Sequence, residues 1–127
     1  MEKISAEIIK NYLNNKVVVL KSTHLTLCVP IINRIYQKMI HGIKFDEIKT
    51  HEELIIDGHH RYISSLLANI EIESIPTHKT SATRMYSWDS VEFVEEEWDT
   101  PFKIDQLNKI DAAYNKIDLE KLIEITK

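Results

Sequence analysis

Glycine, proline and cysteine are scarce in this chain of 127 residues, which contains two glycines, three prolines and one cysteine. The single cysteine, Cys28, excludes an internal disulfide and a zinc site built from several thiolates. Because 43% of the residues are hydrophobic and 28% are charged, the composition is that of a globular protein rather than a disordered one. The length suits one domain with a single hydrophobic core.

Excess positive charge and long apolar runs are also absent. The formal net charge of −4 excludes the globally basic surface that is typical of nucleic-acid-binding domains, although a local basic site stays open. No apolar run approaches the ~18 residues of a membrane-spanning helix. The N-terminus lacks the apolar core of a signal peptide. We therefore expect no membrane partner.

Helical periodicity recurs along the chain. Ser5 is placed to cap one helix, and Pro30 to begin another that ends before Gly42. In the tail, Asp118 can cap the second of two helices. The predicted helices cover residues 5–15, 30–41, 58–69 and two parts of 101–127, broken near 115–118. The apolar stripe of the third helix consists of Ile63, Leu66, Leu67 and Ile70.

Apolar runs and alternating patterns indicate strands between these helices. We expect residues 24–29 to be extended or irregular and residues 77–87 to be a loop. The fold class is therefore α+β: one small domain in which helices pack on a mixed sheet. Residues 1–100 would form its main part, and residues 101–127 a helical extension packed on the same domain. The predicted strands lie within residues 16–21, 43–49, 53–57, 70–76 and 90–98.

An acid, a glycine, two histidines and an arginine lie together at the strand-to-helix junction from Asp57 to Arg61. Gly58 permits close backbone approach, and the free N–H groups of a helix start attract anions. Arg61 adds a permanent charge whose planar fork matches phosphate oxygens, and His59 and His60 add donors or proton carriers. Positive charge is mildly unfavourable in a first helical turn, so this run predicts a phosphate-binding site rather than an ordinary helix start.

Helical geometry gives the side chains of this motif different positions. His59 would face inward, above the apolar stripe, whereas His60, above Ser64, and Arg61 would face the mouth of a pocket. Asp57 is predicted to be the N-cap, either alone or with an orienting, basic or metal-binding role. Gly58 serves either as a simple turn glycine or as part of the site. The remaining histidines are scattered, with no pair at the i, i+4 spacing of metal ligands: His24, His41, His51 and His78.

The stretch IIDGHHRYISSLLA resembles the signature of the ParB/sulfiredoxin-like superfamily, in which a strand and a glycine-containing turn lead to His-Arg at a helix start. The Asp-Gly-His-His-Arg version resembles the ParB-like nuclease modules at the C-termini of bacterial polymorphic toxins. The resemblance is sharp over about residues 53–76 and weaker over residues 1–100. It implies a compact α+β fold whose signature helix points at nucleotide phosphates.

The resemblance also implies roles for single positions. Gly58, His60 and Arg61 stand where sulfiredoxin-like proteins have the glycine, histidine and arginine of their phosphate-binding turn. His59 stands where sulfiredoxin has its catalytic cysteine, so this chain cannot perform thiol chemistry from that position. The glutamate-arginine-arginine pattern of ParB itself is absent, which speaks against partition activity.

The motif and the resemblance together predict phosphate-ester chemistry, with His60, His59 and Asp57 as catalytic residues and Gly58, Arg61 and Ser64 as phosphate-binding ones. The substrate would be a nucleotide, hydrolysed or used as phosphoryl donor, or a nucleic-acid phosphodiester. The alternative is a non-catalytic, nucleotide-binding switch of ParB type. Mg²⁺ accompanying a nucleotide is the one cofactor suggested, and no metal ligands are assigned. A toxin role would imply an immunity-protein partner and a cytoplasmic site of action, with delivery as part of a larger secreted protein.

Overall fold

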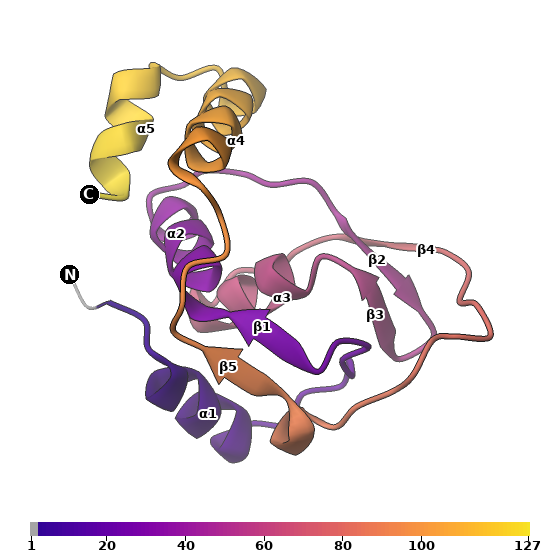
Figure 1. The fold of residues 1–127 in the computed structure, drawn as a ribbon. Helices are drawn as coiled ribbons and strands as arrows, with labels where there is room; N and C mark the ends of the chain where they lie inside the picture. The colour runs from indigo at the N-terminus through magenta and orange to yellow at the C-terminus, as the bar shows by residue number, and fades with distance from the viewer. Residues whose placement is uncertain (1–2) are drawn as a thin grey trace.

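The chain folds into two small β-sheets with helices packed around a central helix (Figure 1). The structure is a computed structural model that describes residues 3–127. Within this range one sheet is a parallel pair and the other is a mixed sheet in the order β3-β2-β4, with β3 antiparallel and β4 parallel to β2. The predicted α+β class is therefore confirmed. The strands are β1 (Thr26–Cys28), β2 (Ile48–His51), β3 (Leu54–Asp57), β4 (Ser74–Pro76) and β5 (Glu92–Val94).

Side-chain caps fix where several helices begin. The Ser5 hydroxyl accepts a hydrogen bond from the Ile8 N–H at 3.2 Å, and the Asp118 carboxylate accepts one from the Glu120 N–H at 3.2 Å. Both predicted caps are thus confirmed. Pro30 lies in the first helical turn, where its missing N–H has no helical partner to lose. The helices are α1 (Ala6–Asn15), α2 (Val29–Ile40), α3 (His59–Leu67), α4 (Pro101–Asn115) and α5 (Leu119–Ile125), with a 3-10 turn at Trp88–Ser90.

The central helix is α3, which contacts α1, α2, β1 and β2. Its predicted stripe is buried at Ile63, but Asn69 takes a left-handed φ of 56° that ends the helical region, and Ile70 is 42% exposed. Burial of apolar side chains around α3 therefore positions the start of this helix, and with it the histidine motif. The main core consists of Ile4, Ile9, Leu27, Val29, Ile32, Ile63, Val91 and Phe93.

Three strand predictions need correction. Residues 16–21 form no strand: Val17 is 97% exposed, and only Lys21 bridges to β3, at Leu54. β-Branched side chains favour strands only where a partner strand and a buried face exist, and this segment has neither. In the predicted strand over 43–49, residues 43–47 are irregular and β2 begins at Ile48. The alternating segment 70–76 yields only the short, exposed β4.

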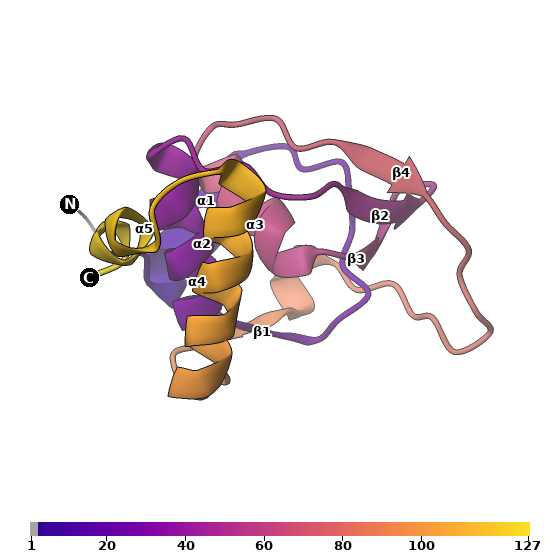
Figure 2. The same cartoon turned by 90° about the horizontal axis from the view of Figure 1, so that it is seen from above.

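The C-terminal helices α4 and α5 lie on the side of α2 opposite α1 (Figures 1 and 2). The buried Lys38 ammonium of α2 pairs with the Asp111 carboxylate of α4 at 2.8 Å. The Asn115 side chain bonds the backbone N–H and carbonyl of Lys44 at 2.7 and 3.0 Å. A second apolar cluster, built on Ile43, Ala112 and Leu122, fills the contact. No helix in the described range is long and apolar enough to span a membrane.

Candidate functional site

The turn between β3 and α3 requires a glycine. Gly58 has a φ of +100°, in the left-handed region that favours glycine, and a Cβ there would lie 2.6 Å from Ile48 Cγ2. Gly58 is also the N-cap, and no side chain caps α3. The predicted N-cap role of Asp57 is therefore wrong, because the turn moves the helix start one residue beyond it. The Asp57 side chain is 65% exposed, with its carboxylate 3.5 Å from the Arg61 guanidinium.

His59 lies inward, as its place above the apolar stripe predicted, and is 2% exposed. Its Nε2 accepts a hydrogen bond from the backbone N–H of Thr23 at 3.0 Å. The Thr23 hydroxyl, 3.3 Å from the same nitrogen, donates instead to the Ile55 carbonyl at 2.7 Å. His59 Nδ1 is buried and has no hydrogen-bond partner among residues 3–127. A buried nitrogen left unpaired costs about 1–3 kcal/mol and calls for an explanation.

His60 uses the same ring nitrogen in the same way. Its Nε2 accepts from the backbone N–H of Cys28 at 2.9 Å, at the junction of β1 and α2. The His60 and Trp98 rings pack edge to face, with centroids 5.7 Å apart and the rings at 90°. Two imidazoles at the start of α3 therefore hold the segment around β1 through backbone N–H groups.

These hydrogen bonds fix the protonation of both rings. An Nε2 that accepts carries no proton, so each neutral ring carries its proton on Nδ1 and offers a donor there. Burial, together with a smaller effect of positive charge on His24, lowers the pKa of His59 to about 3 and that of His60 to about 4. Near neutral pH both histidines are therefore neutral donors. This geometry favours binding an anion over the acid–base role predicted for His60.

The lowered pKa values predict an acid-sensitive fold. Between the ordinary pKa of 6.5 and the folded values, the unfolded chain binds protons that the folded chain excludes, so stability falls as the pH drops through this window. The slope is up to about 1.4 kcal/mol per pH unit for each histidine. In His59→Gln the amide oxygen can replace Nε2 as acceptor. We expect this variant to lose the contribution of one histidine to the slope of the free energy of unfolding between pH 6.5 and 5. Urea unfolding measures this, with His78→Gln in the exposed loop as a control that keeps the full slope.

The side chains of Arg61 and Ser64 make hydrogen bonds to backbone carbonyls of the protein, which the sequence did not predict. One Arg61 amino group donates to the carbonyls of Asp46 and Glu47 at 3.0 and 3.1 Å, which ties the irregular segment before β2 to α3. Ser64 is fully buried, and its hydroxyl lies 2.7 Å from the His60 carbonyl and 3.0 Å from the Ile32 carbonyl. Ser64 therefore lies on the inner face of α3, against α2, and is not among the residues that line the cavity described next.

A cavity of about 490 Å³, here called the α3 cavity, opens at the start of α3. It brings Asp57, Gly58, His59, His60 and Arg61 together, as the motif predicted. The rest of the wall comes from segments distant along the chain, and no pattern in the sequence predicted it. These are His24; Ile31, Arg34, Ile35 and Lys38 of α2; Phe45 and Asp99; and Lys103, Leu107 and Asp111 of α4.

Four basic and three acidic side chains line the α3 cavity. Arg34 pairs with Asp99 at 2.9 Å, Lys38 with Asp111 at 2.8 Å, and Arg61 with Asp57 at 3.5 Å. Lys103, by contrast, is exposed and has no ionic partner within residues 3–127. Its spacing of four residues from Leu107 and eight from Asp111 is a periodic signal in the sequence, but only the packing of α4 on α2 shows which face lines the cavity.

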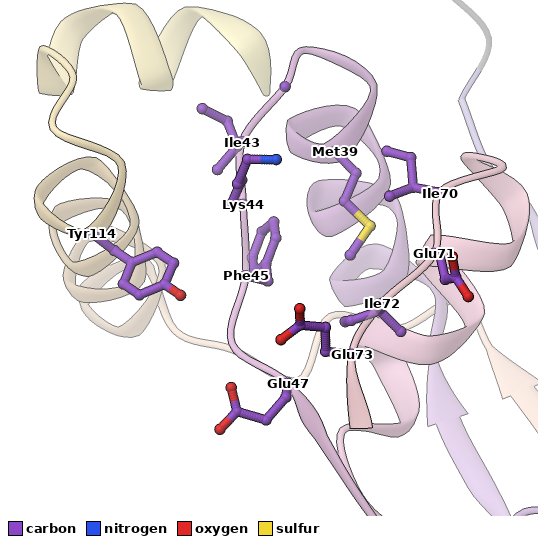
Figure 3. Close-up of a pocket in the computed structure, with 11 residues that line it drawn as sticks. Met39, Ile43, Lys44, Phe45, Glu47, Ile70, Glu71, Ile72, Glu73 and Tyr114 are labelled. Carbon is purple, nitrogen blue, oxygen red and sulfur yellow. The ribbon is translucent and has the colours of Figure 1, made fainter. Parts of the chain in front are cut away.

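A second cavity, of about 370 Å³, lies beside the end of α2 and has the opposite character (Figure 3). The Glu73 carboxylate lies near the Phe45 ring, Glu47 lies further along the same segment, and Tyr114 reaches in from α4. Negative charge on Asp46 raises the pKa of the Tyr114 phenol. This acidic surface repels phosphate, so the α3 cavity is the candidate site.

The residues of the α3 cavity do not form a metal centre. Nowhere in residues 3–127 are three or more histidine, cysteine, aspartate or glutamate side chains arranged to hold a metal ion. In comparisons with family models, curated proteins and solved structures, nothing matched the chain.

Proposed function

We propose that the α3 cavity binds the phosphate of a nucleotide or a nucleic acid, and that the domain hydrolyses or transfers this phosphate ester. The observation that carries the proposal is the buried, unpaired Nδ1 of His59 beside an uncapped helix start. Uncapped N–H groups and the positive end of the helix dipole attract an anion, and an acceptor oxygen would satisfy the histidine.

The cavity supplies charge stabilisation for such a reaction. Negative charge grows on the leaving and bridging oxygens as a phosphate ester breaks, and fixed donors in a water-poor site stabilise it. His59 and His60 would act here as donors, with Arg61 held in place by the carbonyls it binds. We further propose, from the Asp-Gly-His-His-Arg motif, that the chain is of ParB/sulfiredoxin-like type and acts as a bacterial effector with an immunity-protein partner.

A non-catalytic nucleotide switch is the second candidate, and one observation favours it. The Nε2 atoms of His59 and His60 already accept backbone hydrogen bonds, so neither ring has a free lone pair with which to take a proton. A domain with only these two histidines would bind a phosphate without turning it over.

The test is calorimetric titration with ATP, ADP and CTP, with and without Mg²⁺, followed by an assay for released phosphate. We expect saturable binding of at least one nucleotide and about tenfold weaker binding by His59→Met, whose side chain has no N–H donor for the charged group. Binding without phosphate release would select the switch. If no nucleotide binds, single-stranded RNA and DNA are tested next, and failure of all of them contradicts the proposal.

Lys103 provides a sharper test of where the phosphate lies. Its ammonium is the cation of the cavity wall that no carboxylate neutralises within the described chain, so a bound phosphate should attract it. We expect Lys103→Ala to raise the dissociation constant about fivefold at low salt, an effect of about 1 kcal/mol, and less at high salt. Lys109→Ala removes the same charge from α4 outside the cavity and should leave binding unchanged.

A further inference from the structure

The proposed reaction needs an acid–base group in the α3 cavity in addition to the groups that bind the anion. The Nε2 atoms of His59 and His60 are occupied by backbone N–H groups, and Arg61 is always protonated. Each carboxylate of the cavity is in an ion pair: Asp57 with Arg61, Asp99 with Arg34, and Asp111 with Lys38. A proton acceptor for the proposed reaction must therefore come from elsewhere in the wall.

His24 meets this requirement. It lines the α3 cavity and is exposed, and neither of its ring nitrogens makes a hydrogen bond within residues 3–127. Its ring stacks on that of His59, with centroids 3.9 Å apart and planes inclined by 13°. The backbone N–H of His24 donates to the Ser22 hydroxyl at 3.0 Å, which holds the residue beside the start of α3 while leaving the ring nitrogens free.

We propose that His24 is the general base of this site, an assignment that rests on the proposed function. His24 takes a proton from the attacking water as the water oxygen bonds to phosphorus and the bond from phosphorus to the leaving oxygen breaks. The proton then passes from the imidazolium to the leaving oxygen, so one phosphate ester and one water give a phosphate and an alcohol or a shorter nucleotide. His59, beneath the His24 ring, stays neutral and donates to the phosphate.

The surroundings of His24 suit this role. The nearest titratable groups, His59 and His60 of α3, are neutral near pH 7 because burial lowers their pKa values. The charged groups in the same wall are largely paired with one another, and the bound phosphate would be the partner for the imidazolium that forms. The charged groups of this wall are Arg34 and Lys38 of α2, Asp57 and Arg61 beside the turn, and Asp99, Lys103 and Asp111.

The test compares His24→Ala with His78→Ala, which removes an exposed histidine from the loop far along the chain. The probes are ATP, CTP and a single-stranded RNA, with binding and product formation measured separately. Since the His24 ring makes no hydrogen bond to any residue that the structure describes, His24→Ala should fold and should bind within about threefold of the unchanged protein. We expect turnover to fall about 10²- to 10³-fold, the low-pH limb of the rate profile to disappear, and added imidazole to restore part of the rate.

Other results would overturn the assignment. Equal turnover by His24→Ala and the unchanged protein would remove His24 from the mechanism and leave the proposed function intact. Binding without turnover in the unchanged protein would also overturn it, and would favour the switch. If the unchanged protein binds none of the probes, the proposed function fails, and the assignment of His24 fails with it.

Discussion

Gly58→Ala should destabilise the domain by about 2–5 kcal/mol, because the left-handed backbone costs a residue with a Cβ about 1–2 kcal/mol and overpacking costs about 1–3 kcal/mol. The new methyl group would lie 2.6 Å from Ile48 Cγ2 and 3.0 Å from an Arg61 amino nitrogen, on a backbone with a φ of +100°. Neither neighbour moves freely, since Ile48 is 1% exposed in the core and Arg61 holds two backbone carbonyls. Urea unfolding gives the change in free energy.

Gly42→Ala is the matched control for this substitution. Gly42 also has a positive φ, of 88°, but a Cβ there would meet nothing within 4 Å. Gly42→Ala should therefore lower the free energy of unfolding only by the conformational cost of a left-handed alanine, about 1–2 kcal/mol. Equal losses of stability at the two positions would show that the positive φ alone requires glycine at position 58. The turn would then pack against β2 more loosely than the 2.6 Å distance to Ile48 indicates.

Asp111→Asn should destabilise the domain by about 3–5 kcal/mol, the range for breaking a buried ion pair by removing one charge. Its partner Lys38 is 3% exposed, and the two groups are 2.8 Å apart. Removing the carboxylate leaves a buried ammonium with no opposite charge at that contact, and it weakens the attachment of α4 to α2. Because α4 forms one wall of the α3 cavity, its weaker attachment should also change the shape of this cavity.

Asp105→Asn on the same helix controls for the loss of a carboxylate. Asp105 pairs with Lys109 at 3.0 Å, but both side chains are about half exposed, so this pair contributes only about 0.3–0.5 kcal/mol. The double variant Lys38→Met, Asp111→Leu tests the mechanism further, since an apolar pair of similar size should recover most of the loss. No recovery would indicate that shape, rather than the unpaired charge, dominates at this contact.

Much of the fold could be predicted because the signals were local. Ser5 and Asp118 cap helices through bonds to residues two or three positions away, and such short-range geometry is the same in any fold. The buried strand before the motif, the glycine turn and the helix after it were visible for the same reason. The strand expected at residues 16–21 failed because strand formation depends on a partner, and the neighbouring edge of β3 pairs only with Lys21.

The features of the site are likewise either local in the sequence or dependent on long-range contacts. The sequence by itself determined that a glycine turn presents two histidines at a helix start, since this depends on adjacent residues and helical spacing. Only the tertiary structure decided what those histidines can do, because their Nε2 atoms are occupied by the N–H groups of Thr23 and Cys28, 36 and 32 residues away. It also brought His24 onto the His59 ring. Such contacts depend on how the segment around β1 packs against α3, and no local pattern in the sequence encodes that packing.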